Sequence, residues 1–259
     1  MSQGQAPGPQ GGLGSEAAAM EAALEDFHSV SYLRHNSRRL EHLASLNLPI
    51  RDRSVLELGA GVGDHTTYFL DRGCSVTCVE PRAENCTLLA SLMNERRNTG
   101  YTAASRCRIM RADALAFEPV LTESFDIVHC YGLLYHTDDP AAVLAAIARK
   151  CTGLLLLETC VAFGANEAIN PVPELAHIPS QSVSGFGCRP TRPWLFRRLS
   201  ELFGHAYVPR TQPAHEDFPL DWTGSQPTDR EARAVFIGSR QKLDNPLLLS
   251  QLPYQQIPN

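Results

Sequence analysis

Short apolar runs alternate with longer amphipathic stretches through the middle of the chain. The apolar runs have the length and the aliphatic content of buried strands, and the stretches between them repeat apolar residues at helical spacing. We expect strands at 54–58, 75–80, 106–110, 125–130 and 153–158, and helices at 64–72, 84–97 and 140–150. Strands that alternate with helices predict an α/β fold, in which helices cover both faces of a parallel sheet.

The two ends of the chain depart from this alternation. Residues 19–46 predict an amphipathic helix, with 29–31 as a candidate break. After the fifth strand, residues 159–190 are rich in Pro, Gly and Ser, which predicts a long loop of the kind that is usually functional in a compact domain. A helix at 193–203 and two strands at 206–209 and 234–239 complete the expected elements.

The 259 residues suit one α/β domain with extensions. Residues 1–18 are rich in Gly, Pro and Gln, which predicts a disordered tail. The expected units are this tail, a helical lid at 19–50, the α/β domain at 51–244 with a long loop at 160–192, and an extended, poorly ordered C-terminal tail at 245–259.

Composition and charge narrow the class of protein. Hydrophobic residues make up 43% of the chain, which suits a protein with a buried core, and the net charge of −5 gives no basic excess for a nucleic acid. The eight cysteines form no C-x-x-C pair, so we expect free thiols in a reducing compartment. No signal peptide or run of membrane-spanning length is present in the sequence. We therefore expect a cytoplasmic protein, monomeric or homodimeric, without a membrane or nucleic-acid partner.

The strongest chemical signal is the glycine-rich segment that follows the first strand, Gly59-Ala60-Gly61-Val62-Gly63. Glycines permit a tight turn and let a ligand touch the backbone. Two acids flank it, Glu57 in the strand and Asp64 at the start of the next helix. A carboxylate here would repel the pyrophosphate of a dinucleotide but suits a cationic ligand such as S-adenosylmethionine (SAM). Asp64 has an equally simple interpretation as the N-cap of the helix.

Further acids follow the second and third strands. Glu80 ends the second strand, where an acid can accept both hydroxyls of a ribose. Asp113 and Ala114 follow the third strand, where a carboxylate and a backbone N–H can bind an adenine, although Asp113 also suits an Asx turn. The segment Asp126–His136 leaves the fourth strand toward the same place. All these features lie at the carboxyl ends of strands, where open parallel sheets bind their ligands.

The stretch 54–160 resembles class I SAM-dependent methyltransferases. Residues 57–63 are similar to the first motif of that family, Glu80 to its ribose-binding acid and Asp113 to its adenine-contacting acid. Residues 131–140 are similar to a segment found in small-molecule methyltransferases and in relatives that modify the wobble uridine of tRNA. The resemblance implies a Rossmann-like three-layer sandwich with a seven-stranded, mostly parallel sheet whose last strand is antiparallel, plus the N-terminal helical lid.

The resemblance also implies a set of ligand contacts. SAM would be bound and S-adenosylhomocysteine (SAH) released. In the family an N-terminal helix often closes over the cofactor, which makes Tyr32 and Arg34 candidates for its methionine carboxylate. The cofactor-binding residues that we expect are Tyr32, Arg34, Glu57, Gly59, Ala60, Gly61, Gly63, His65, Glu80, Pro81, Asp113, Ala114 and Tyr131.

Residues near the expected methyl group are candidates for chemistry on the acceptor. His136 lies just past the fourth strand, and its ordinary pKa near 6.5 suits a general base. Tyr135 is a second catalytic candidate. In the loop 160–192, Phe163 and Phe186 are expected to wall a substrate pocket, and Arg189 and Arg192 to bind a carboxylate or phosphate. Each of these residues also has a purely structural interpretation, as packing or as solvated charge.

Nine histidines raise the question of a metal site. His136, His177, His205 and His215 are candidates to converge with an acid. No pair of histidines has the i, i+4 spacing that places two ligands on one helix face, so we expect no metal.

The sequence thus predicts a SAM-dependent methyltransferase that acts on an N, O or C nucleophile of a small molecule, such as an amino-acid-derived or secondary metabolite. Three alternatives stay open. One is an enzyme of the tRNA wobble-uridine type, against which the acidic total charge argues. Another is a SAM-binding domain without turnover, against which the intact loop argues. The third is an NAD-dependent oxidoreductase, in which the position of Asp64 would be glycine.

Overall fold

The computed structural model describes residues 12–113, 117–119, 121–176, 178, 181, 182, 184–225 and 228–259. Its centre is a mixed sheet in the order β11-β8-β10-β5-β4-β1-β2-β3. The strands are β1 Ser54–Leu58, β2 Ser75–Glu80, β3 Cys107–Arg111, β4 Phe125–Tyr131, β5 Cys151–Cys160, β8 His205–Pro209, β10 Arg233–Ser239 and β11 Leu248–Leu249.

Strands β3, β2, β1, β4 and β5 are parallel neighbours, whereas β10 runs antiparallel to both β5 and β8. The predicted α/β fold with an antiparallel last strand is confirmed. The two-residue β11, which pairs with β8, adds an eighth strand that the sequence pattern did not predict.

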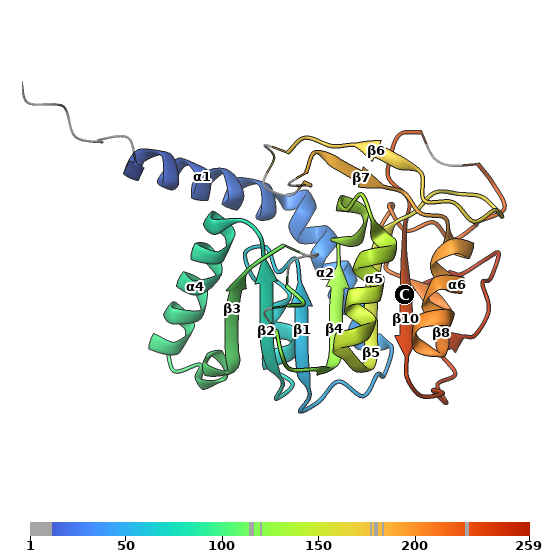
Figure 1. Ribbon diagram of the computed structural model, residues 1–259, viewed down its shortest axis with the longest axis horizontal. Coiled ribbons are helices and arrows are strands. Elements are labelled where there is room, and N and C mark those ends of the chain that lie inside the picture. Colours follow the sequence, from blue (N-terminus) through green and yellow to red (C-terminus); the bar gives the residue numbers. More distant parts are fainter. Residues whose placement is uncertain are drawn as a thin grey trace, which may run out of the picture.

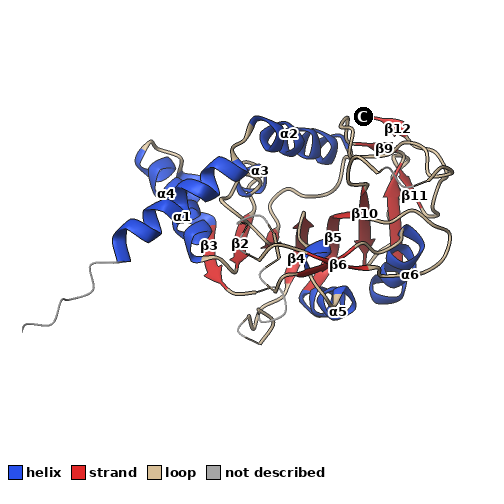
Figure 2. Cartoon of the chain, turned by 90° about the horizontal axis from the view of Figure 1, so that it is seen from above, coloured by secondary structure: helices blue, strands red, loops and turns tan. Residues whose placement is uncertain are grey.

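Helices cover both faces of the sheet and make three layers (Figures 1 and 2). One face carries α2 Val30–Ser45, α3 Thr66–Leu70 and α4 Ala83–Asn98, and the other carries α5 Pro140–Lys150 and α6 Arg192–Phe203. Each face has its own apolar core, one containing Phe69 and Leu89 and the other Leu144 and Leu199. Burial on both faces explains why the central strands are almost wholly apolar.

The N-terminal prediction needs a correction. Helix α1 spans Gly12–Phe27, so residues 12–18 belong to a helix and not to a disordered tail, while residues 1–11 lie outside the described residues. The predicted break is present, because Ser29 caps α2 by accepting a hydrogen bond from the Tyr32 N–H. The N-cap interpretation of Asp64 is wrong, since α3 begins at Thr66 and its N-cap residue is His65.

The C-terminal tail is extended, as predicted, but it is packed. Strand β12, Ile257–Pro258, pairs with β9, Thr211–Gln212. The buried Gln256 amide donates to the Pro209 carbonyl oxygen at 2.6 Å. These contacts hold the last residues against the edge of the molecule and correct the prediction of poor order for the tail.

The long loop after β5 crosses the carboxyl ends of the parallel strands (Figure 1). It contains a short antiparallel pair, β6 Pro171–Pro173 and β7 Phe186–Cys188. The remaining elements are the 3₁₀ helices η1 Thr102–Arg106 and η2 Leu134–His136. Among the described residues, no helix combines the length and the apolar character needed to cross a membrane.

Candidate functional site

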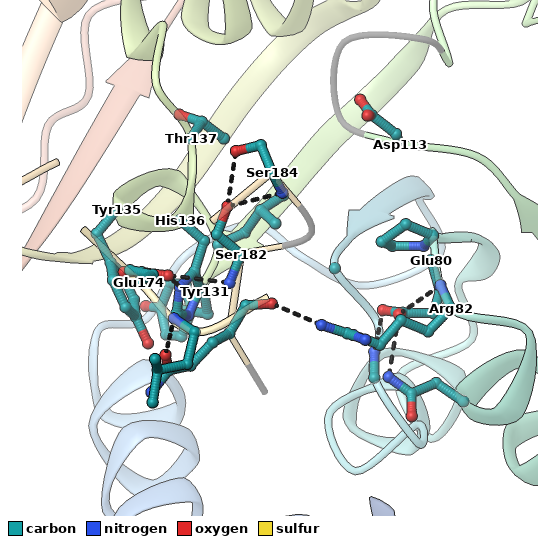
Figure 3. A pocket seen from close by; sticks show the side chains of 18 of the residues that line it. Glu80, Arg82, Asp113, Tyr131, Tyr135, His136, Thr137, Glu174, Ser182 and Ser184 are labelled. Atoms are coloured by element: carbon teal, nitrogen blue, oxygen red, sulfur yellow. Dashed lines mark hydrogen bonds and ion pairs between the residues drawn. The ribbon is translucent and has the colours of Figure 1, made fainter. Parts of the chain in front are cut away.

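A cavity of about 840 Å³ lies where the carboxyl ends of β1, β2 and β4 meet the loop between β5 and α6. This volume falls within the range of roughly 300–1,000 Å³ that is typical of small-molecule sites. Figure 3 shows two groups of side chains in it, one around Glu80 and Asp113 and the other around Tyr135, His136 and Glu174. The α1–α2 junction contributes Phe27 and Tyr32 to its wall.

The glycine loop after β1 forms part of the cavity wall with its backbone. Gly59 and Gly61 both have positive φ angles, 68° and 55°. A side chain at Gly61 would lie 3.0 Å from the Phe27 ring, so glycine is needed for both conformation and space. Gly63 has a different role from the one predicted, since a Cβ there would lie 2.2 Å from Leu89 of α4. This glycine allows close helix packing and does not line the cavity.

Three hydrogen bonds hold the Glu80 carboxylate at the cavity wall. Its Oε2 accepts the Gly61 N–H at 3.0 Å, and its Oε1 accepts the Arg82 N–H at 3.1 Å and the Asn85 amide at 3.0 Å. Burial raises the pKa of this carboxyl, and the three hydrogen bonds oppose that effect. Pro81 and Asp113 line the same end, whereas Ala114 lies outside the described residues.

A small side cavity of about 30 Å³ opens on the other side of the glycine loop. Glu57, Ala60, Asp64, His65 and Tyr131 line it, together with three side chains of α2: Tyr32, Asn36 and Arg39. Several buried polar atoms here have no hydrogen-bond partner within the part of the chain that the structure describes, which is costly unless a ligand supplies one. They are Asn36 Oδ1, Arg39 Nε, His65 Nε2 and both ring nitrogens of His129.

A buried ionic triad contributes one side chain to each cavity, Arg233 to the larger and Arg39 to the smaller. Glu158 of β5, which is fully buried, accepts from Arg39 Nη1 and from Arg233 Nη1, both at 3.1 Å. Arg233 also donates to the Tyr135 hydroxyl at 2.9 Å and lines the larger cavity. Two guanidinium groups thus share one carboxylate, which leaves one positive charge of the triad unpaired beside the ligand space.

His136 lies in the larger cavity with an acid behind it. Its Nδ1 lies 2.5 Å from Oε2 of Glu174, which follows β6, and the same oxygen accepts the Ser182 N–H at 2.9 Å. Arg189 approaches the other Glu174 oxygen at 3.4 Å and pairs with Glu231 at 2.9 Å. Burial lowers the pKa of His136, and the Glu174 carboxylate raises it back in part. The imidazole is therefore neutral at pH 7, with Nε2 free of any partner among the described residues.

Four predicted contacts lie elsewhere. Arg34 points away from the cavity and forms a two-pronged pair with Glu216. Arg192 packs over the Trp222 ring, 4.0 Å from its centre, and Phe163 contacts the same ring. Phe186 is 58% exposed and does not line the cavity. None of these four residues lines either cavity.

Sequence reasoning also missed residues that line the site. Two of them, Asn36 and Arg39, could have been found from their spacing. Together with the predicted Tyr32 they have the i, i+4, i+7 spacing of one face of α2, and Arg34 does not lie on that face. Glu174 and Ser182 come from a segment without periodicity, and Arg233 from the start of an ordinary strand. No local pattern indicated those three.

The comparisons with known proteins agree with this geometry. Residues 56–153 match the family model described as "Methyltransferase domain". The chain is 29% identical to thiol S-methyltransferase TMT1B of Rattus norvegicus over 130 residues, which are 48% of this chain and 51% of that protein. It is 30% identical to the ubiquinone biosynthesis O-methyltransferase of Psychrobacter arcticus over 121 residues, 46% of this chain and 45% of that protein. The match thus spans about half the length of these curated relatives.

Solved structures show the same fold over most of the chain. The N-terminal domain of EvdMO1, crystallised in the presence of SAH and D-fucose, has a TM-score of 0.58 at 21% identity, over 80% of this chain and 83% of that one. The 1,6-didemethyltoxoflavin-N1-methyltransferase of Burkholderia thailandensis, with its substrate and SAH bound, has a TM-score of 0.55 at 18% identity, over 92% and 94%. Residues 56–153 are therefore similar to a methyltransferase domain, and the chain has the Rossmann-like fold of these two solved structures.

Proposed function

We propose that this protein transfers a methyl group from SAM to a nucleophilic atom of a small molecule. One observation carries the proposal. The Glu80 carboxylate at the end of β2 and the backbone of the glycine loop line the same cavity and are joined by a hydrogen bond. Two findings support it. Residues 56–153 match a methyltransferase domain, and the relatives are named as a thiol S-methyltransferase and an O-methyltransferase of ubiquinone biosynthesis.

The residues present fit the cofactor at both of its ends. Glu80 is fixed by three hydrogen bonds and would accept the ribose hydroxyls, and Asp113 lines the space where an adenine would lie. At the other end, the partnerless Arg39 Nε would donate to the methionine carboxylate, and Asn36 Oδ1 would accept from its ammonium group. The unpaired positive charge of the Arg39–Glu158–Arg233 triad makes an anion at this end favourable.

Bound SAM supplies an activated methyl group, and the chain must orient the acceptor, exclude water and take up a proton. Tyr131, Leu133 and Tyr135 provide a wall from the segment after β4. His136 is the group suited to take the proton, because its Nδ1 is bound to Glu174 and its Nε2 is left to accept. We propose Glu174 as the residue that orients this imidazole.

A base of this kind serves an acceptor that carries a removable proton. We propose hydroxyl and thiol groups as the first classes of acceptor. The relatives of the chain include a thiol S-methyltransferase and an O-methyltransferase. Amine nitrogen and carbon acceptors are the other classes open to the same cavity. The loop supplies polar groups that would recognise the rest of the molecule, from Gln181, Ser182, Ser184 and Arg189.

Calorimetry tests the cofactor directly. The wild-type chain should bind SAM and SAH with micromolar dissociation constants and should not bind NAD. Glu80→Gln should weaken SAH binding by about 10-fold to 100-fold, the equivalent of a charged hydrogen bond worth roughly 1.5–3 kcal/mol.

Glu95→Gln is the matched control, because it makes the same change at an exposed position of α4 and should leave the affinity unchanged. Preferential binding of NAD, or an unchanged SAH affinity in a folded Glu80→Gln variant, would contradict the proposal.

A further inference from the structure

Two histidines and an aspartate gather outside both cavities, between α2 and the segment 213–218. His35 comes from α2, and His215 and Asp217 come from that segment, about 180 positions along the chain. One ligand atom from each residue lies within 4.8 Å of the other two. His35 is 7% exposed, and none of the three lines either cavity, so the cluster is separate from the site described above.

The distances within the cluster match those between the ligands of a tetrahedral ion. His35 Nδ1 lies 3.2 Å from Asp217 Oδ2, and His215 Nδ1 lies 3.6 Å from the same oxygen. Glu216 Oε2 is 3.7 Å from His215 Nδ1 and offers a fourth donor. Bonds of roughly 2.0–2.2 Å to a zinc ion place tetrahedral ligand atoms about 3.4 Å apart. The atoms of His35, His215 and Asp217 therefore need only small shifts to share one ion, and the half-exposed Glu216 side chain would turn to reach it.

Three polar groups surround Nδ1 of His215. The backbone N–H of Asp217 donates to this nitrogen at 3.3 Å, and carboxylate oxygens of Asp217 and Glu216 lie 3.6 and 3.7 Å from it. A cation bound here would replace the long N–H contact and would attract both carboxylates.

We propose that His35, His215 and Asp217, completed by Glu216, form a binding site for a divalent transition-metal ion, with zinc as the best fit. Imidazole and carboxylate donors in a four-coordinate arrangement are typical of zinc. Because the nearest ligands come from two segments far apart in the sequence, the expectation of no metal, which rested on spacing within one helix, did not exclude this site.

The nearby arginines can accommodate the added charge. Arg34 holds Glu216 in an ion pair, and its Nη1 lies 3.3 Å from His215 Nε2. The side chains of Arg34 and Glu216 are 49% and 47% exposed, so the pair contributes little, and Arg34 can turn to solvent when Glu216 binds the ion. The deeper Arg39 and Arg233 share Glu158 and keep one net positive charge, so the carboxylates of Asp217 and Glu216 must neutralise the ion.

Such an ion would fasten α2 to the rest of the molecule. Helix α2 supplies Tyr32, Asn36 and Arg39 to the side cavity, and the Asp217 carbonyl oxygen accepts the Arg233 N–H at 2.7 Å. The metal would therefore hold the helical wall of the cavity against the start of β10, as a structural clip and not as a catalytic group.

Titration of the full-length, tag-free and chelator-treated chain with Zn²⁺, followed by calorimetry, tests the site. We expect one zinc ion per chain with submicromolar affinity, a rise in melting temperature with zinc, and the strong visible absorption of tetrahedral cobalt when Co²⁺ is used. Asp217→Asn and His215→Ala should each weaken zinc binding by at least about 30-fold, as expected for the loss of a ligand. His205→Ala is the control histidine and should bind zinc like the wild type.

A second buried group, Glu57, His65 and His129, lies in the side cavity and could also hold an ion. Saturation with SAH distinguishes the two, because SAH would occupy the side cavity but not the cluster on α2. Zinc binding that survives SAH and is lost in Asp217→Asn supports the proposal. Zinc binding that SAH abolishes, that Asp217→Asn leaves intact, or that is absent from the wild type overturns it. If His215→Ala does not fold, the conservative Asp217→Asn decides.

Discussion

At the scale of single residues, the pair formed by His136 and Glu174 controls what the acceptor end of the cavity can do. Hydrogen bonding of Nδ1 to Glu174 fixes the neutral tautomer that leaves Nε2 as an acceptor. Since burial lowers the pKa of His136 and Glu174 only partly raises it back, the base form is present throughout the neutral range. The rate of methyl transfer should therefore fall only below pH 6.5, the ordinary histidine pKa, where His136 becomes protonated.

Replacement of the two residues should separate chemistry from cofactor binding. With small thiols or phenols as acceptors and SAH release as the assay, His136→Ala should lose about 10²-fold to 10⁴-fold in kcat, the usual contribution of a general base. Glu174→Gln should lose less, and its acid limb should move to lower pH, because the carboxylate that raises the pKa of His136 is gone.

Both variants should keep the wild-type affinity for SAH by calorimetry, and His205→Ala should behave as the wild type in both assays. Full activity in His136→Ala would remove this residue as the base. An acid limb that stays in place in Glu174→Gln would show that Glu174 does not act through the imidazole.

At the scale of elements, the loop between β5 and α6 is attached to the cofactor end of the cavity through one side chain. Arg82 Nη2 donates to the carbonyl oxygens of Ala176, Ile178 and Gln181, at 3.0, 2.8 and 3.2 Å. The Arg82 N–H also donates to Glu80. The loop that carries Glu174 is thus tied to the carboxylate that we propose as the ribose ligand, on the opposite side of the cavity.

Loss of this tie should loosen the loop without unfolding the domain. In Arg82→Ala, hydrogen exchange in a peptide covering 171–188 should become at least about 10-fold faster, since hydrogen bonds from a charged group are worth roughly 1.5–3 kcal/mol. Arg111→Ala is the matched control, because Arg111 donates to the Pro81 carbonyl oxygen but not to the loop. Equal exchange in both variants would mean that Arg82 does not hold the loop.

The elements also show what could be predicted from sequence. Strands β1 to β5 and helices α4 to α6 were predicted within about two residues, because their apolar periodicity is a local property. The glycine loop, Glu80 and Asp113 could be placed at the cavity from the sequence, because each lies at or directly after a strand end. Their binding of a cofactor stays a prediction. Glu174, Arg233 and the partners of His35 were not found, since they meet only through tertiary packing between segments that lack any shared local pattern.

At the scale of the whole molecule, the buried triad joins parts that are far apart in the sequence. Arg39 lies on α2, Glu158 on β5 and Arg233 on β10, so one carboxylate connects the helical wall to two neighbouring strands. Burial raises the pKa of Glu158, but the two arginines outweigh it, and the net pKa lies below its ordinary 4.5. A carboxyl group whose pKa is lower in the folded than in the unfolded state stabilises the fold above pH 4.5. This stabilisation is lost as the pH falls through the pKa of the folded state.

Glu158→Gln should therefore lower the free energy of unfolding at pH 7 by about 3–5 kcal/mol, because it leaves two buried guanidinium groups without a counter-charge. Urea denaturation followed by circular dichroism measures the loss, and the gap between variant and wild type should narrow only below pH 4.5. Glu167→Gln breaks the exposed pair with Arg197 and should cost no more than about 1 kcal/mol. A loss in Glu158→Gln as small as in this control would mean that the triad does not hold α2 and the two strands together. Because a bound anion would offset the unpaired charge, SAH should also stabilise Glu158→Gln more than it stabilises the wild type.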